Sequence, residues 1–395
     1  MRFPAIAASL LLFAPCAADA QQPATRATGR SVTGLPALNF DADEGLGYGA
    51  LLQYYDYGDA GIEPYRFTLQ PTVFLTTRGR RDVILFMDAP HLLPSGWRLG
   101  ASVAREQQLA TPFYGVGNST VADTNKSKSP NPYYYRFGRT VLRGSADVQH
   151  VVGIPALRLL VGAGVRNITV RPVPYDSGTT LLAESIASRL EQPATNVRYA
   201  RAGLVWDTRD REIGTHEGNW SELLVQHAAR VLGGDESYTR ITGSMRQFVP
   251  LVENVTFAER VVMQTVRGDP SVSEMFTVQS SYKDDEALGG ASSIRGIPKN
   301  RYVGKGVAFA NSELRWSAAQ FDLMGRSTRL VLSGFVDAGR VWPDGLNLSE
   351  VATDLHLGYG GGIRLAIGPS FVLATDVGHS SQSAAAIYIG LGYLF

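Results

Sequence analysis

The side chains of this sequence that could do chemistry are mainly arginines and carboxylates near the ends of apolar segments. The densest group is Asp207, Arg209, Asp210 and Arg211. A metal site or an acid–base pair is one interpretation of such a group, and salt bridges at a turn are the other. Arginine and carboxylate groups pair readily through charge-assisted hydrogen bonds, so we favour a salt-bridged rim where a strand ends.

Two histidines also lie beside acidic residues. His216-Glu217 lacks the second histidine at helical spacing that a zinc-protease motif requires. Asp376 and His379 resemble the Asp/His pairs of outer-membrane hydrolases, but they lie where a strand meets a rim, and we favour a hydrated rim. The clustered glycines of "GYGGGIR" (358–364) precede no helix, so they do not predict a phosphate site. We therefore predict no enzyme, no catalytic residue, no metal site and no cofactor.

A glycine-rich stretch, "LGGASSIRGIPKNRYVGKG" (288–306), holds an Arg295-Gly296 step, and two acidic strand positions, Glu313 and Asp337, follow it. A guanidinium can bind one carboxylate through two hydrogen bonds and still reach a second one. Glycine after the arginine permits close passage of the backbone or a positive φ angle. Most arginines on loops lie in water, so the bare sequence leaves both a buried and a solvated Arg295 open.

Composition narrows the class of protein. The 395 residues hold 37 Lys+Arg against 36 Asp+Glu. The basic surplus of a nucleic-acid-binding protein is absent, so we predict no nucleic-acid partner. With 42 glycines, 17 tyrosines and only 18% charged residues, the chain suits an all-β fold with many turns and a large buried or lipid-facing surface.

The N-terminus has the pattern of a secretory signal peptide. Arg2 precedes an apolar run over residues 3–18, and Ala18-Asp19-Ala20 offers a cleavage site. We predict a signal peptide at 1–20, cleaved after about Ala20, which would also remove Cys16, the single cysteine. No later stretch approaches the roughly 18 apolar residues of a spanning helix, which leaves a soluble β protein or an outer-membrane barrel.

Apolar residues alternate along the last segment, "AAAIYIGLGYLF" (384–395). Ile387, Ile389, Leu391, Tyr393 and Phe395 share one face, as in a strand with one apolar face. Segments 156–166 and 329–338 alternate in the same way, with arginine or aspartate on the second face. A soluble sandwich would give the same alternation, but a chain ending on aromatics favours a barrel. We expect Tyr393 and Phe395 to mark the closing strand, with the aromatic at the membrane interface.

About sixteen strands follow from this pattern. Short connections at 213–217, 250–254, 321–327 and 368–369 alternate with long ones at 111–133, 172–196, 268–305 and 343–354, as in barrels whose two rims differ. We predict a linker at 21–33 and one antiparallel transmembrane β-barrel over 34–395. The predicted strand starts are 35, 45, 66, 81, 96, 134, 155, 197, 219, 237, 255, 306, 328, 355, 370 and 384.

Four stretches in order resemble the BamA/TamA superfamily, also called bacterial surface antigens, over roughly 197–395. They are the loop at 289–306 with "NSELRW" (311–316), "WDTRDREIGTHEGNW" (206–220), "FVDAGRVW" (335–342), and "YGGGIRLAIGPSFVLATDVG" (359–378) with the terminal Phe395. At the position after Arg-Gly, where the superfamily has an aromatic, this chain has Ile297. Only 21–33 lie between the predicted signal and barrel, so the resemblance is to short members without POTRA domains.

The resemblance implies that the 268–305 loop folds into the lumen, where Arg295 and Gly296 form a latch with Glu313 and Asp337. It also implies a protein of the bacterial outer membrane that helps to insert, export or move proteins or lipids. Its partners would be the lipid bilayer and client outer-membrane or secreted proteins. A passive pore, a barrel enzyme and a surface adhesin are the alternatives.

Overall fold

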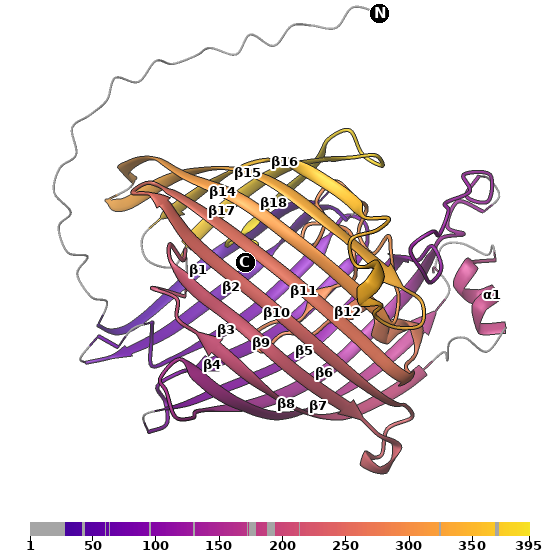
Figure 1. Ribbon diagram of the computed structural model, residues 1–395, viewed down its shortest axis with the longest axis horizontal. Helices are drawn as coiled ribbons and strands as arrows, with labels where there is room; N and C mark the ends of the chain where they lie inside the picture. The colour runs from indigo at the N-terminus through magenta and orange to yellow at the C-terminus, as the bar shows by residue number, and fades with distance from the viewer. Residues whose placement is uncertain are drawn as a thin grey trace, which may run out of the picture.

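The computed structural model describes residues 28–395 except for 42–43, 60, 63, 95, 129–130, 172, 174–178, 188–193, 213, 324 and 368–370. Sixteen antiparallel strands close into a barrel in which β1 pairs with β18 (Figure 1). The barrel strands are β1 (Gly29–Asp41), β2 (Gly45–Gly58), β3 (Phe67–Thr76), β4 (Arg80–Ala89), β5 (Trp97–Pro112), β6 (Arg136–Val151), β7 (Leu157–Arg171), β8 (Ala194–Asp207), β9 (Gly218–Ala228), β10 (Ser237–Val252), β11 (Val255–Asp269), β14 (Gly306–Leu323), β15 (Arg326–Trp342), β16 (His356–Ile367), β17 (Phe371–Ser380) and β18 (Ala386–Leu391).

The predicted barrel and its strand number are confirmed. Every strand except the first begins within three residues of its predicted start. β1 begins at Gly29, before the predicted barrel start at 34, because its whole length pairs with β2. The predicted signal peptide (1–20), with Cys16, and most of the predicted linker lie outside the described residues.

The two-residue period of the sequence sorts side chains between the lumen and the outer surface. On β7, Leu159 and Val161 are exposed outward, whereas Arg166 is buried. Side chains of successive strand residues point to opposite faces, so one face of each strand can contact lipid while the other carries charges. The inside of the barrel consequently holds buried ion pairs, such as that of Arg166 with Glu274, next to clusters of buried apolar side chains.

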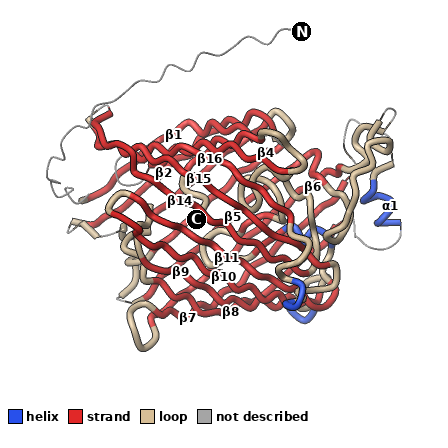
Figure 2. The backbone as a smooth tube through the Cα atoms, turned by 45° about the horizontal axis from the view of Figure 1, so that its top comes forward, coloured by secondary structure: helices blue, strands red, loops and turns tan. Residues whose placement is uncertain are grey.

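The connections differ at the two ends of the barrel. Short turns such as 253–254 join strands at the end where β1 begins and β18 ends, whereas the opposite end carries the long connections and the short helix α1 (Leu181–Ala187) (Figure 2). No helix among the described residues has the length and hydropathy needed to cross a bilayer. We call these the terminal end and the loop end.

The longest connection, 270–305, folds into the barrel as predicted. It contains the 3-10 helix η2 (Val272–Phe276) and a two-stranded sheet of β12 (Thr277–Val278) with β13 (Asp285–Glu286). Leu288, Ile294, Ile297 and Tyr302 of this loop pack in one apolar cluster with the lumen-facing residues Val262, Val307, Phe309 and Val341 of the wall. Apolar packing therefore holds the loop against β11, β14 and β15.

The expected course of the closing strand is wrong beyond Leu391. β18 ends there, and Gly392 adopts a positive φ of 90° while its N–H donates to the carbonyl of Val372. The positive φ turns the last residues out of the sheet. Tyr393 and Phe395 consequently lie against the guanidinium of Arg315, whose Cζ is 4.7 and 4.9 Å from the two ring centroids, rather than at the lipid interface.

Candidate functional site

The structure brings Arg295, Glu313 and Asp337 together inside the barrel. Nε and Nη2 of Arg295 donate to the two carboxylate oxygens of Asp337, each at 2.8 Å, and Nη1 donates to Glu313 at 2.6 Å. All three residues are fully buried. Charge-assisted, bidentate pairs of this kind are the stronger ion pairs in proteins. The loop is thus tied to β14 and β15 through one side chain.

Nearby carboxylates keep Arg295 charged. Burial alone would lower the pKa of the guanidinium, but Asp337, Glu313 and Asp376 outweigh this effect and raise its pKa above the usual value. The third carboxylate, Asp376 on β17, accepts from Nη1 at 3.3 Å. Asp376 is buried and also pairs with Arg364 at 2.6 Å. The expectation that Asp376 lies on a hydrated rim is therefore wrong, because its side chain points into the lumen.

Two features of the backbone fix the position of the arginine. Gly296 has a φ of 93°, and a Cβ atom there would lie 2.7 Å from the carbonyl carbon of His379. A Cβ atom on Gly358 of β16 would overlap the carbonyl oxygen of Arg295. The N–H of Gly296 donates to the Tyr388 hydroxyl at 3.1 Å, and its carbonyl accepts from Ser380 at 2.6 Å. The loop backbone thus lies directly on β16, β17 and β18.

The other residues that could do chemistry are placed differently. His379 is exposed on the outer face of β17, where it contacts the carbonyl of Ala384, so it does not face Asp376. Asp207 is bound by Arg209 through two hydrogen bonds of 2.9 Å, and Asp210 pairs with Arg211, as expected for a salt-bridged rim. Within the described residues no three His, Cys, Asp or Glu side chains are grouped as metal ligands.

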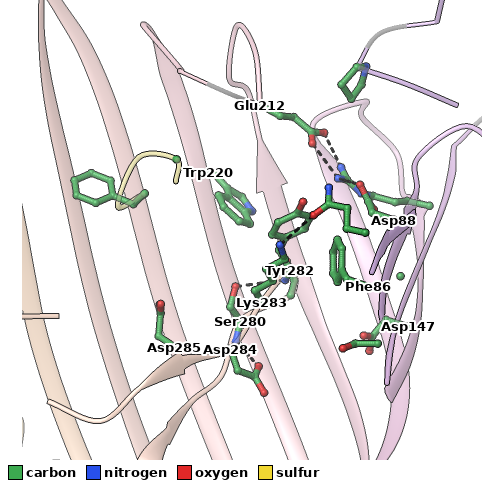
Figure 3. A pocket seen from close by; sticks show the side chains of 18 of the residues that line it. Phe86, Asp88, Asp147, Glu212, Trp220, Ser280, Tyr282, Lys283, Asp284 and Asp285 are labelled. Carbon is green, nitrogen blue, oxygen red and sulfur yellow. Dashed lines mark hydrogen bonds and ion pairs between the residues drawn. The ribbon is translucent and has the colours of Figure 1, made fainter. Parts of the chain in front are cut away.

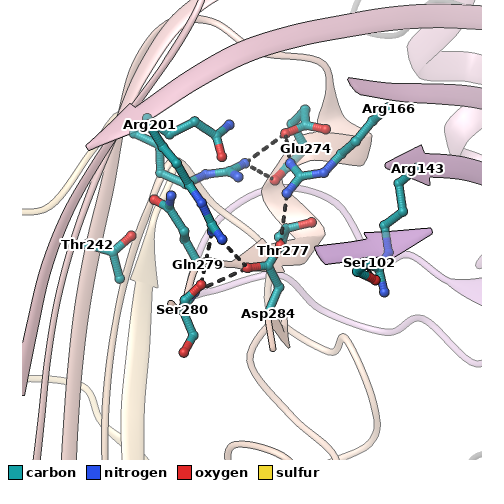
Figure 4. A network of polar contacts seen from close by, with 12 residues as sticks. Ser102, Arg143, Arg166, Arg201, Thr242, Glu274, Thr277, Gln279, Ser280 and Asp284 are labelled. Atoms are coloured by element: carbon teal, nitrogen blue, oxygen red, sulfur yellow. Dashed lines mark hydrogen bonds and ion pairs between the residues drawn. The ribbon is translucent and has the colours of Figure 1, made fainter. Parts of the chain in front are cut away.

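Residues 272–286, which we call the tip of the loop, are held by a second group of ion pairs (Figure 4). Arg166 on β7 donates to Glu274 and to Asp284, both at 2.9 Å, and Arg240 on β10 donates to Glu274 at 3.0 Å. Burial raises the pKa of Glu274, but Arg166 and Arg240 outweigh burial and lower it to about 2. This group ties the loop to β7 and β10, strands that the Arg295 latch does not contact.

A third tie joins the loop to the first hairpin. Nζ of Lys299 donates to Glu44, in the turn between β1 and β2, at 2.6 Å. Arg80 donates to the other carboxylate oxygen of Glu44 at 2.9 Å. Burial alone would raise the pKa of Glu44, but Lys299 and Arg80 lower it to about 2. The loop therefore contacts both the first hairpin and the last strand of the barrel.

A cavity of about 700 Å³ remains in the lumen between the loop tip and the C-terminal residues (Figure 3). Tyr282 and Lys283 of the tip project into it beside Phe86, with Lys283 Nζ 4.5 Å from that ring centroid. Burial lowers the pKa of Lys283 to about 8. Phe395 lines the cavity from the terminal end. The loop tip and the C-terminal residues thus narrow the lumen from the two ends of this cavity.

With this geometry established, comparison with known proteins identifies the family. Residues 77–392 match the model of the Omp85 superfamily domain. The chain belongs to the Omp85 superfamily. The resemblance to BamA and TamA is thereby confirmed, and membership implies a barrel of the bacterial outer membrane. Short turns of such barrels face the periplasm and long loops face outward, so the terminal end of this barrel faces the periplasm.

Solved Omp85-type structures share the fold at low sequence identity. BamA from Haemophilus ducreyi lacking POTRA domains 1–3 is 13% identical, with a TM-score of 0.57 over 93% of this chain and 70% of that chain. CdiB from Escherichia coli is 12% identical, with a TM-score of 0.59 over 92% of this chain and 63% of that chain. No curated protein matches the chain in sequence.

Sequence reasoning missed several partners of Arg295 and of the loop. The ring of Phe335 lies against the guanidinium of Arg295. Phe335 is two residues before Asp337 and therefore shares its face, so this position could have been read from the sequence. Asp376 shares the inward phase of β17, opposite to His379. Lys299 and Glu44 are 255 residues apart, and no local pattern could have joined them.

Proposed function

We propose that this Omp85 barrel assists the insertion or translocation of proteins at the outer membrane, through a weak seam between β1 and β18. The barrels of BamA and CdiB share its fold, and the family resemblance of the loop implies this kind of role. The observation that carries the proposal is the seam itself. Among the described residues β1 pairs with β18 only through Phe40↔Ile389 and Asp41↔Tyr388, whereas it pairs with β2 from Gly29 to Asp41.

The short seam leaves backbone groups of β1 without a strand partner on that side in the described chain. β18 has only 6 residues against 13 in β1. Unpaired N–H and C=O groups are costly in hydrocarbon and can template an incoming strand. An edge of this kind could pair with a strand of a client during its insertion.

The latched loop supports control of this seam from inside. Gly296 contacts Tyr388, the register partner of Asp41, and Lys299 binds Glu44 in the turn that follows Asp41. One loop therefore touches both strands that meet at the seam. Release of the loop would remove contacts from both β1 and β18, and the seam between these strands could then open.

A disulfide across the seam tests the proposal. The variant Phe40→Cys with Ile389→Cys joins register partners of β1 and β18. Oxidation should abolish the ability of the protein, reconstituted in liposomes, to accelerate folding of a barrel client, and reduction should restore it. The matched control, Phe40→Cys with Leu46→Cys, joins register partners of β1 and β2 and should retain activity. Full activity of the oxidised seam variant would contradict the proposal.

A passive pore is the second candidate, because the lumen retains the cavity of about 700 Å³. Single-channel conductance in planar bilayers separates the two functions. For a latched barrel we expect low conductance in the wild type and larger, fluctuating conductance in Arg295→Ala. Large and steady conductance in the wild type would favour the pore.

The proposed activity is non-enzymatic. The outward position of His379 and the inward position of Asp376 support this part of the proposal. Purified protein should show no lipid or peptide hydrolysis that is lost in His379→Ala. Hydrolysis that depends on His379 would contradict it.

A further inference from the structure

We propose that the outer rim over β4 and β5 binds the phosphate group of an outer-leaflet lipid through Arg81 and Arg105. Both arginines are exposed on the lipid-facing side of the wall. Neither guanidinium has a hydrogen bond or an ion pair with any residue in the described part of the chain. This contrasts with the lumen, where arginines such as Arg295 and Arg166 are paired with carboxylates.

The register brings the two side chains close together. Arg81 is opposite Gln107, and Arg105 is opposite Val83. Arg81 and Arg105 are therefore diagonal neighbours on one face, about 7–8 Å apart, and their Cβ atoms are somewhat closer. Two long side chains at this separation can converge on one anion. Guanidinium groups bind phosphate oxygens through paired hydrogen bonds, so a phosphate monoester fits the pair.

The surface below the arginines suits acyl chains. Val83, Leu85 and Val103 are 56%, 48% and 58% exposed on the same outer face. Arg81 lies two residues from the turn at 77–79 that ends β3 at the outer rim. A lipid whose head group is at the rim would place its chains along these apolar residues. Charged residues on the lipid face are tolerated near the interface but not at the midplane.

A cavity of about 690 Å³ at the same rim is lined by Arg81, together with Arg80 and Lys299. Its lining includes five cationic side chains but a single carboxylate, that of Glu44. Glu44 is bound by Lys299 and Arg80, and these two cations are also paired with Glu286 and Asp82. Arg136, also in the lining, donates to the neutral carbonyl of Ala110. The cavity therefore retains positive charge next to Arg81, which favours an anionic head group.

Equilibrium binding to the full chain in nanodiscs tests the site. The probes are fluorescent diphosphoryl lipid A and the same lipid after removal of its phosphates. We expect the double variant Arg81→Ser with Arg105→Ser to bind the phosphorylated lipid at least about tenfold more weakly, the loss expected for about one charge-assisted hydrogen bond. The dephosphorylated lipid should bind weakly to both proteins. Arg81→Lys with Arg105→Lys should recover part of the affinity.

The matched control is Arg267→Ser, which removes an exposed arginine of the outer rim on β11 and should change affinity less than about twofold. Heat-modifiable migration in gels verifies that each variant is folded. Equal affinity of wild type and double variant, or an equal loss in Arg267→Ser, would overturn the proposal. Displacement of the lipid by millimolar inorganic phosphate would also overturn it, because the site would then bind free anions. This inference does not depend on the proposed seam function.

Discussion

Phe335 lies against the guanidinium of Arg295, with its ring centroid 3.4 Å from Cζ. The aromatic partner of the latch arginine thus comes from β15, two residues before Asp337, while Ile297 in the loop packs in an apolar cluster. Cation–π contacts of desolvated groups contribute about 2 kcal/mol. We expect Phe335→Leu to lower the free energy of unfolding by that amount, measured by urea titration in micelles. Phe321→Leu, at an exposed outer position, should change it much less.

Removal of the latch arginine should be more damaging. Arg295→Ala leaves Glu313 and Asp337 buried next to each other without their shared cation, and loss of one partner of a buried ion pair costs about 3–5 kcal/mol. Urea titration should show a loss of this size. Arg211→Ala, which removes a half-exposed pair with Asp210, should cost less than about 1 kcal/mol. Similar losses in the two variants would contradict the latch.

Space for the loop backbone is a separate requirement. In Gly358→Ala the new methyl group would overlap the carbonyl oxygen of Arg295, so either the loop or β16 must shift. We expect a loss of about 1–3 kcal/mol and faster proteolysis of the 270–305 loop. Gly334→Ala places a methyl group where nothing lies within 4 Å and should leave both properties unchanged. Unaltered proteolysis of Gly358→Ala would argue against close docking.

Docking of the loop should weaken in acid. The pKa of Glu44 and that of Glu274 are each lowered from 4.5 to about 2. Because a lowered folded-state pKa stabilises the folded form above the unfolded pKa, this stability is complete above about pH 5 and is lost as the pH falls toward 2. Each group contributes at most about 3 kcal/mol. Free energies of unfolding measured from pH 6 to pH 2 should fall, and Glu44→Gln should show a smaller fall. An identical pH profile for the variant would contradict the role of Glu44.

The position of the C-terminus gives a spectroscopic prediction. Phe395 lies near Arg315 and Arg260 inside the lumen. A spin label on Phe395→Cys should therefore be more accessible to a water-soluble nickel complex than to oxygen dissolved in lipid. A label on Leu391→Cys, whose parent side chain is 41% exposed on the outer face, should show the reverse. High oxygen accessibility at position 395 would contradict this prediction and would indicate that Phe395 lies at the lipid interface.

The sequence by itself determined the barrel, because each strand carries the alternation of a wall with lipid on one side and charge on the other. It also placed Glu313 and Asp337 on the inner face, since their phase follows from apolar neighbours such as Leu314. The resemblance of the loop to a known family supplied the pairing with Arg295. The alternation of apolar and charged residues, together with short recognisable stretches, was sufficient to predict these features.

Only the tertiary structure decided which distant groups meet inside the lumen. The pairing of Lys299 with Glu44, and the shared binding of Asp376 by Arg295 and Arg364, depend on how a long loop folds across the closed barrel. The inward turn at Gly392 depends on a positive φ that glycine permits but does not require. Ion pairs between residues far apart in sequence carry no periodic signal, because charge attraction depends on distance in space and not on separation along the chain.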